Sequence, residues 1–191
     1  MFKLAPLSSR NQFGELLNGR SLLGTAVEIG THRGEFANII LQQWHGCKLW
    51  CVDPWTVPAG YEAQAELLRG GGTRLDDLAE TRVRLAEHSG RVELFRGTSR
   101  SATNTVPDYV DFVYVDGDHR RDHVLFDLIQ WWIKIRAGGI LAGHDWIQPG
   151  EQHRWADEIQ WAVSEFSRCV EVDVQLIVEE GGLPWSYYIE K

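Results

Sequence analysis

The chain has 191 residues, of which 43% are hydrophobic and 24% are charged, and its formal net charge at pH 7 is −8. This length suits one compact domain, and the hydrophobic content excludes an intrinsically disordered chain. The excess of acidic residues argues against non-specific binding of nucleic acid, which depends on clustered Lys and Arg.

Five short apolar runs predict the strands of a parallel sheet. Their apolarity is continuous, which is typical of strands covered by helices on both faces. Apolar residues at helical spacing predict helices between them and after them. The predicted strands are residues 25–29, 48–53, 92–96, 110–115 and 138–143, and the predicted helices are residues 34–44, 122–136 and 151–168.

The C-terminal residues change in character. Residues 170–178 alternate with period two, and a further strand over 183–189 follows a Glu-Gly-Gly turn, which predicts an antiparallel hairpin. The whole pattern predicts an α/β three-layer sandwich. We expect a single domain over 1–191, with a helical N-terminal segment (1–23), a ligand-binding core (24–147), and a C-terminal helix and hairpin (148–191).

The turn after the first strand is a candidate ligand-binding loop. It reads Glu28-Ile29-Gly30-Thr31-His32-Arg33-Gly34, and its glycines let backbone N–H groups approach a ligand at the start of a helix. It is not the GxGxxG pattern of dinucleotide-binding proteins. Asp53, which ends the second strand, is placed to accept hydrogen bonds from ribose hydroxyls. An ordinary strand–helix turn, and a turn initiated before Pro54, are the plainer alternatives.

The fourth and fifth strands both end in polar residues. Because neighbouring parallel strands end at the same edge of a sheet, these residues should cluster there, and such a cluster costs desolvation unless it binds something. Carboxylates of Asp116 and Asp145 suit Mg²⁺, and His144 is a third candidate ligand that favours softer metals. The alternative is that the aspartates cap turns and His119 is solvated. The two segments are Val115-Asp116-Gly117-Asp118-His119 and Gly143-His144-Asp145-Trp146.

Five segments together resemble the successive motifs of class I S-adenosylmethionine-dependent methyltransferases, and most closely the methyltransferase domain 24 group. That group is related to metal-dependent O-methyltransferases that act on catechols and sugar hydroxyls. The resemblance covers about residues 24–147 and implies a Rossmann-like, mostly parallel sheet of seven strands with S-adenosylmethionine as the cofactor. The segments are VEIGTHRGEFA, LWCVDPW, FRGTSRSA, DFVYVDGDHRRDHVLFDLIQWW and RAGGILAGHDW.

The resemblance also implies roles for individual residues. Thr98 and Ser99 would approach the adenine, Asp53 would bind the ribose, and Trp55 is a candidate for stacking on the adenine or on the substrate. The implied cofactor-binding set is Glu28, Gly30, Thr31, Gly34, Asp53, Trp55, Thr98, Ser99 and Asp116.

The same resemblance places metal and catalytic residues. Asp116 matches the first metal aspartate, and His144 and Asp145 match a terminal acidic pair in which metal-dependent relatives carry aspartate at the first position. A divalent cation such as Mg²⁺ would lower the pKa of the acceptor hydroxyl. His119, beside Asp118, matches the basic residue that removes the proton of the acceptor hydroxyl.

The sequence therefore predicts a methyltransferase that uses S-adenosylmethionine and acts on a hydroxyl of a small molecule, either a sugar or a phenol. One alternative is a nicotinamide-dependent oxidoreductase, although GxGxxG and a Tyr/Lys catalytic pair are absent from the sequence. Another is a non-catalytic domain that binds S-adenosylmethionine, which His144 in place of an acidic ligand leaves open. The region 57–72 and the loop after Trp146 are expected to select the acceptor.

The remaining expectations concern location and partners. Cys47, Cys51 and Cys169 contain no CxxC pair, which favours reduced thiols over a disulfide framework. No stretch approaches the ~20 apolar residues of a transmembrane helix, and no signal peptide is apparent at the N-terminus. We expect a cytoplasmic protein with no membrane or nucleic-acid partner. Trp131 and Trp132, adjacent on one predicted helix, make a contact in a homo-oligomer a further expectation.

Overall fold

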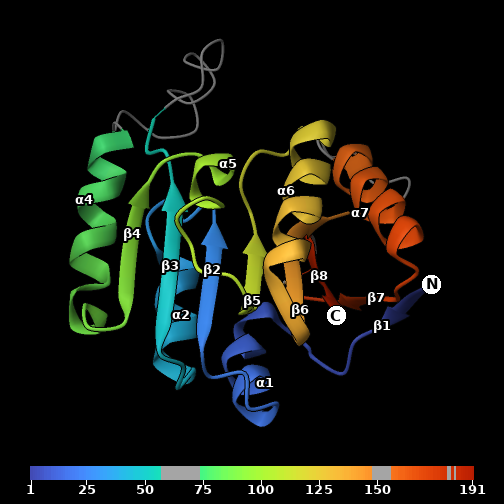
Figure 1. The fold of residues 1–191 in the computed structure, drawn as a ribbon, viewed down its shortest axis with the longest axis horizontal. Helices are drawn as coiled ribbons and strands as arrows, with labels where there is room; N and C mark the ends of the chain where they lie inside the picture. Colours follow the sequence, from blue (N-terminus) through green and yellow to red (C-terminus); the bar gives the residue numbers. More distant parts are fainter. Residues whose placement is uncertain (57–73, 148–155, 180–181, 183) are drawn as a thin grey trace.

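The protein is a mixed sheet flanked by helices on both faces (Figure 1). The structure is a computed structural model that describes residues 1–56, 74–147, 156–179, 182 and 184–191. Within these residues the sheet has eight strands in the order β1-β7-β8-β6-β5-β2-β3-β4.

The central strands are parallel and lie where the sequence predicts them. They are β2 (Thr25–Ile29), β3 (Lys48–Asp53), β4 (Val92–Arg96), β5 (Val110–Val115) and β6 (Ile135–Trp146). All six residues of β5 are buried, as expected of a strand covered on both faces. β6 is longer than the predicted strand over 138–143, because it also pairs with a strand on its other side.

The predicted C-terminal hairpin is confirmed. β7 (Val174–Ile177) and β8 (Trp185–Glu190) are antiparallel, and β8 is also antiparallel to β6. This reversal closes one side of the parallel sheet and places the hairpin next to the ends of β5 and β6.

The N-terminal segment contains a strand that the sequence does not signal. β1 (Phe2–Leu4) pairs in parallel with β7 at the edge of the sheet, so the expectation of a wholly helical segment 1–23 is wrong and the sheet has eight strands instead of seven. The pairing is reinforced by ion pairs from the N-terminal amino group and from Lys3 to Asp173. Three exposed residues carry too little periodicity to predict a strand. A short 3-10 helix, η1 (Arg10–Gln12), and α1 (Phe13–Gly19) follow.

Two hydrophobic clusters bury the two faces of the sheet. One contains α5 (Ser99–Ala102), α6 (Arg121–Lys134) and α7 (Ala156–Val170), with Trp131 fully buried at its centre. The other contains α1 and α2 (Glu35–Gln43) packed on Phe112 and Tyr114 of β5. α4 (Arg74–Arg84) and a 3-10 helix, η2 (Ala86–His88), lie beside β4. None of the helices in the described residues is long and apolar enough to cross a membrane.

Gly30 fixes how the loop after β2 meets the end of β5. The amide of Asp116 donates a hydrogen bond to the carbonyl oxygen of Ile29 at 2.8 Å. Gly30 has φ of +88°, and a Cβ atom there would lie 2.1 Å from the carbonyl oxygen of Asp116. Only glycine permits this approach, which places the end of β2 directly beside Asp116.

Replacing Gly30 with alanine should therefore destabilise the protein by more than about 2 kcal/mol, since the left-handed backbone and the clash both oppose a side chain. Urea unfolding measures the loss. Gly19→Ala is the control, because a Cβ atom there meets nothing within 4 Å and the position is helical. Equal urea midpoints for Gly30→Ala and the wild type would show that this contact is not required.

Candidate functional site

The ends of β5 and β6 bring two carboxylates and two imidazoles together. Asp116 follows β5, and His144 and Asp145 lie in the last residues of β6. One side-chain donor atom from each of Asp116, His144 and Asp145 lies within 4.8 Å of the others. The three predicted metal-binding residues are therefore neighbours in space. Asp145 has φ of +59°, an uncommon conformation for a residue with a side chain and one that recurs at functional sites.

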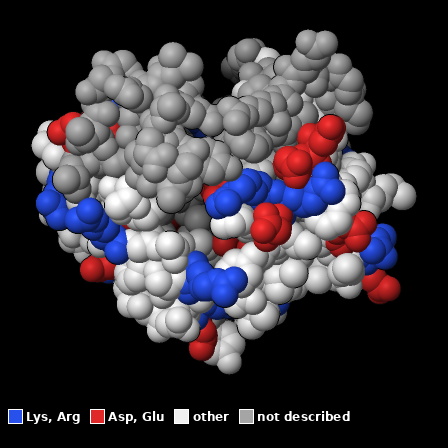
Figure 2. All heavy atoms as spheres, turned by 90° about the horizontal axis from the view of Figure 1, so that it is seen from above, with Lys and Arg blue, Asp and Glu red and all other residues white. Residues whose placement is uncertain are grey.

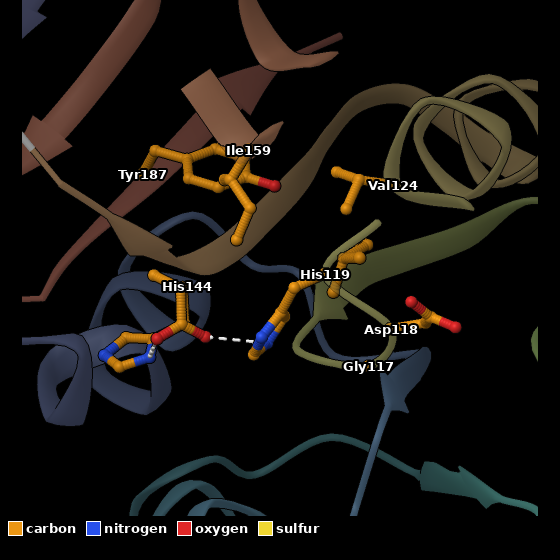
Figure 3. Close-up of a pocket in the computed structure, with 9 residues that line it drawn as sticks. Gly117, Asp118, His119, Val124, His144, Ile159 and Tyr187 are labelled. Atoms are coloured by element: carbon orange, nitrogen blue, oxygen red, sulfur yellow. Dashed lines mark ion pairs between the residues drawn. The ribbon is translucent and has the colours of Figure 1, made fainter. Parts of the chain in front are cut away.

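His119 turns toward this cluster from the loop after β5 (Figure 3). Its Nε2 lies 3.0 Å from Oδ2 of Asp145 and 4.0 Å from Oδ1 of Asp116. His144 approaches Asp145 from the other side, with Nδ1 3.3 Å from Oδ1. Asp145 is thus held between two imidazole rings, and His119 connects it with Asp116.

These contacts determine the charges in the cluster. Burial alone would lower the pKa of His119, but the carboxylates of Asp116 and Asp145 raise it to about 10. Burial would raise the pKa of Asp145, but hydrogen bonds from His119 and His144 hold it below its usual range. At neutral pH, His119 and Asp145 therefore form an ion pair.

Asp118, the other predicted catalytic residue, points away from this pair (Figure 3). Its Oδ1 accepts hydrogen bonds from the backbone amide and from Nε of Arg120, both at 3.0 Å, and its Oδ2 lies 3.4 Å from Nδ1 of His123. The carboxylate of Asp118 lines the pocket formed with His119, His144 and Asp145, but it is paired with Arg120. Its position suits shaping the loop more than proton transfer.

Arg10 completes the cluster and was missed by the sequence reasoning. Its Nη1 lies 3.4 Å from Oδ2 of Asp116 and 3.3 Å from the hydroxyl of Tyr114. Arg10 begins η1, 106 residues before Asp116 in the chain, so no local motif signals the contact. A guanidinium so close to the carboxylate makes Arg10 a permanent positive charge inside the site.

Three neighbours hold Arg10 in this position. Its backbone amide donates to Oε1 of Glu179 at 2.9 Å, and the hydroxyl of Ser186 donates to the same oxygen at 2.8 Å. Its guanidinium lies over the ring of Phe36, 5.5 Å from the centroid. The N-terminal segment is therefore attached both to the C-terminal hairpin and to α2.

Glu28, at the end of β2, is a buried acid without a full set of partners. Its side chain is 3% exposed, and Oε2 has no hydrogen-bond partner among the described residues. Burial raises its pKa to about 8, and the Thr31 hydroxyl only partly lowers it. An uncompensated buried carboxyl at the mouth of a glycine-containing loop is suited to binding a cationic or hydroxyl-bearing ligand.

Asp53 and Trp55 connect the loops after β2 and β3. Oδ2 of Asp53 accepts a hydrogen bond from the amide of His32 at 3.0 Å, and Oδ1 accepts one from the amide of Trp55 at 2.6 Å. Trp55 is 1% exposed, and its Nε1 donates to the carbonyl oxygen of His32 at 2.7 Å. The ring of Trp55 thus offers no free face for stacking in this structure and instead holds the glycine loop in place.

Thr98 and Ser99 begin α5 and are also engaged within the protein. Oγ1 of Thr98 caps the helix by accepting a hydrogen bond from the amide of Ser101 at 3.2 Å. The Ser99 hydroxyl donates to Asp127 and accepts from Nε1 of Trp131 at 2.9 Å. Burial raises the pKa of Asp127 to about 6. Asp127 therefore anchors the loop on which the predicted adenine-binding residues lie.

A divalent cation does not fit the cluster as it stands. Asp116 and Asp145 converge as such an ion requires, but the contacts given above place a protein nitrogen beside each of their oxygens. Arg10 and His119 already supply the positive charge. We therefore derive no step through a bound metal.

The surface at this edge of the sheet mixes charges of both signs. Figure 2 looks onto the edge and shows Lys and Arg side chains lying next to Asp and Glu side chains. The items of this pattern include ion pairs of Arg33 with Asp77 and of Arg121 with Glu158. The predicted acceptor-selecting regions, 57–72 and the loop after Trp146, lie almost wholly outside the described residues, which resume at 156.

Comparison with known sequences gives one family match. A family model described as a methyltransferase domain matches residues 27–146, the span that contains Glu28, Asp53 and the His119 cluster. An uncharacterised protein of Acanthamoeba polyphaga mimivirus is 24% identical over 146 residues, which are 74% of this chain. The chain spans 58% of that protein's length.

Solved structures share the fold at low sequence identity. The O-methyltransferase from Bacillus cereus, in complex with SAH, has a TM-score of 0.67 and 14% identity, with 99% of this chain and 83% of that chain covered. An rRNA methylase from Streptococcus thermophilus has a TM-score of 0.58 and 12% identity, with 92% and 95% covered. These similarities support the Rossmann-like α/β fold.

The ion pair predicts an unusual titration. We expect the His119 ring to keep its proton up to about pH 10 in NMR spectra of the imidazole nitrogens, and Asp145→Asn to lower that pKa. Because the unfolded-state pKa is near 6.5, the stabilisation from this pair is complete below about pH 6.5 and is lost as the pH rises toward 10. The difference in unfolding free energy between the wild type and His119→Gln should shrink over that range. Loss of the proton near pH 6.5 would contradict the ion pair.

Proposed function

The chain belongs to the methyltransferase domain family, and from that premise we propose that it transfers the methyl group of S-adenosylmethionine to a hydroxyl oxygen of a small molecule. The observation that carries the proposal is the juxtaposition of a buried, under-bonded Glu28 with the His119–Asp145 pair at one edge of the sheet. One suits a cofactor with a positive charge and hydroxyls, and the other suits movement of a hydroxyl proton.

The residues at the ends of β2 and β3 fit this cofactor. Glu28 has an unused acceptor oxygen, and Gly30 and Gly34 both have positive φ, so the backbone of the loop passes close to the ligand space. Asp53 uses one lone pair on each oxygen for the amides of His32 and Trp55, and it retains acceptor capacity for ribose hydroxyls. When bound, the cofactor supplies an already activated methyl group.

The chain must then align the acceptor and receive its proton. We assign the proton to Nε2 of His119, because this is the ring atom that faces Asp116 and Asp145. The neutral form of His119 accepts the proton, and Asp145, 3.0 Å away, stabilises the imidazolium that results. Holding the reacting atoms in line contributes about 7–11 kcal/mol in favourable cases.

A small-molecule acceptor is favoured over RNA by the charge of the described surface. The chain carries a net charge of −8, and the arginines near the site, including Arg33, Arg120 and Arg121, are paired with acidic side chains. Binding of a phosphate backbone depends on cations free to replace counterions. An RNA acceptor is the outcome that would replace this part of the proposal.

The proposal is tested by methyl transfer from labelled S-adenosylmethionine to panels of sugars, phenols and ribosomal RNA. We expect label in a small molecule, and a loss of about 100-fold or more in kcat for His119→Ala, as for removal of a general base. His45→Ala is the matched control, since His45 is exposed and precedes β3 at the opposite edge of the sheet.

The pH profile tests the assigned base separately. Because the pKa of His119 is raised to about 10, kcat/KM should increase about tenfold per pH unit at lower pH. Asp145→Asn should move this limb to lower pH. Label only in RNA, binding of NAD in place of S-adenosylmethionine, or full turnover by His119→Ala would each contradict the assignment that it tests.

Glu28 predicts how cofactor affinity depends on pH. With a pKa of about 8 in the free protein, Glu28 must ionise to bind a cationic ligand, so affinity should rise as the pH increases from 6 to 9. Calorimetry with S-adenosylmethionine measures this. Glu28→Gln should bind weakly and lose the pH dependence of affinity, while remaining folded, because an uncharged amide avoids the desolvation of a buried carboxylate. Equal affinity of the wild type at both pH values would contradict the role.

A further inference from the structure

We propose that Arg10 and His119 together take the place of a divalent cation, so that this chain neither needs nor binds a metal at Asp116 and Asp145. The proposal rests on the proposed function for what the site does, but not for what the site binds. It concerns a residue, Arg10, that lies outside the span of the family match at 27–146.

Each carboxylate oxygen of the pair faces a nitrogen of the protein. Oδ2 of Asp116 lies 3.4 Å from Nη1 of Arg10, and Oδ1 lies 4.0 Å from Nε2 of His119. Oδ2 of Asp145 lies 3.0 Å from the same Nε2, and Oδ1 lies 3.3 Å from Nδ1 of His144. Nε2 of His119 thus lies between the two carboxylates, where an ion shared by them would have to bind.

The donor set is also a poor match for Mg²⁺. That ion prefers near-octahedral oxygen ligands at about 2.0–2.1 Å, whereas the third candidate ligand here is an imidazole nitrogen of His144. To reach both carboxylates, an ion would first have to break the contact between His119 and Asp145. Such exchange costs the ion pair and leaves His119, a partly buried ring, to find another partner.

Arg10 adds a second obstacle, because it cannot withdraw easily. Its backbone amide is bound to Glu179, which also accepts a hydrogen bond from Ser186, and its guanidinium lies over Phe36. An ion bound to Asp116 would share that carboxylate with a guanidinium 3.4 Å away. Like charges in such proximity repel by several kcal/mol at an effective dielectric constant of ~20, which lowers the affinity for any divalent cation.

The substitution has a chemical consequence for the site. A metal stabilises the negative charge that develops on an acceptor oxygen by direct coordination. Here N–H groups of His119 and Arg10 are available at the same edge, fixed before any ligand binds. Preorganised donors of this kind stabilise a developing charge without reorganisation.

The test is calorimetric titration of the full-length protein with MnCl₂ and with MgCl₂, without substrate or cofactor, up to about 1 mM. We expect no saturable binding by the wild type and an unchanged melting temperature in EDTA. His119→Ala removes the cation between the carboxylates, and we expect it to bind Mn²⁺ at least tenfold more tightly. Adding Asp116→Asn to His119→Ala should abolish that gain. His123→Ala, which removes an exposed histidine beside Asp118, is the matched control and should bind no Mn²⁺.

Two results would overturn the proposal. The first is stoichiometric binding of either ion by the wild type that Asp145→Asn abolishes. The second is a His119→Ala variant that gains no affinity for Mn²⁺, because His119 would then not be what excludes the ion. If His119→Ala does not fold, His119→Gln and the wild-type titration decide the matter. Neither titration involves methyl transfer, so failure of the proposed function leaves this result interpretable, and metal-independent binding with no turnover would refute only that function.

Discussion

The carboxylates collected at one edge of the sheet need partners, and this requirement organises the site. Parallel strands end together, so Glu28, Asp53, Asp116 and Asp145 lie close to one another and are all partly or fully withdrawn from water. Each solves the problem differently. Asp53 binds two backbone amides, Asp116 binds Arg10, and Asp145 binds two histidines. Glu28 retains an unpartnered oxygen and instead shifts its pKa to about 8. The unresolved acid is the one at which a ligand has most to contribute.

Much of this arrangement could be predicted from the sequence, because its signals are local. Continuous apolar runs predict β2, β3, β4 and β5 at their observed residues, and the polar residues that follow two of the strands meet as expected. The contribution of the N-terminal segment could not be predicted. β1 is three exposed residues long, and it owes its existence to pairing with β7, about 170 residues later. Arg10 reaches Asp116 through that same segment, and its partner Glu179 lies near the other end of the chain.

Other residues show why residue type and position are not enough to assign a role. Trp55, Thr98 and Ser99 each follow a strand, where ligand-binding residues are expected. In the structure their side chains make a backbone hydrogen bond, a helix cap and a buried hydrogen bond with Asp127, respectively. These contacts shape the loops that would surround a cofactor, and they act on it through geometry. The same polar side chains can satisfy the protein or a ligand, and only the three-dimensional partners distinguish the two cases.

The central claim is that the charge of the acidic edge is balanced from within the chain, by Arg10 and His119. The most direct measurement is a crystal structure of the protein grown with MnCl₂ and S-adenosylhomocysteine, with anomalous data collected near the manganese absorption edge. The account predicts no anomalous peak between Asp116 and Asp145, and Nε2 of His119 within hydrogen-bond distance of Asp145. A manganese peak coordinated by both carboxylates, with His119 turned away, would contradict it.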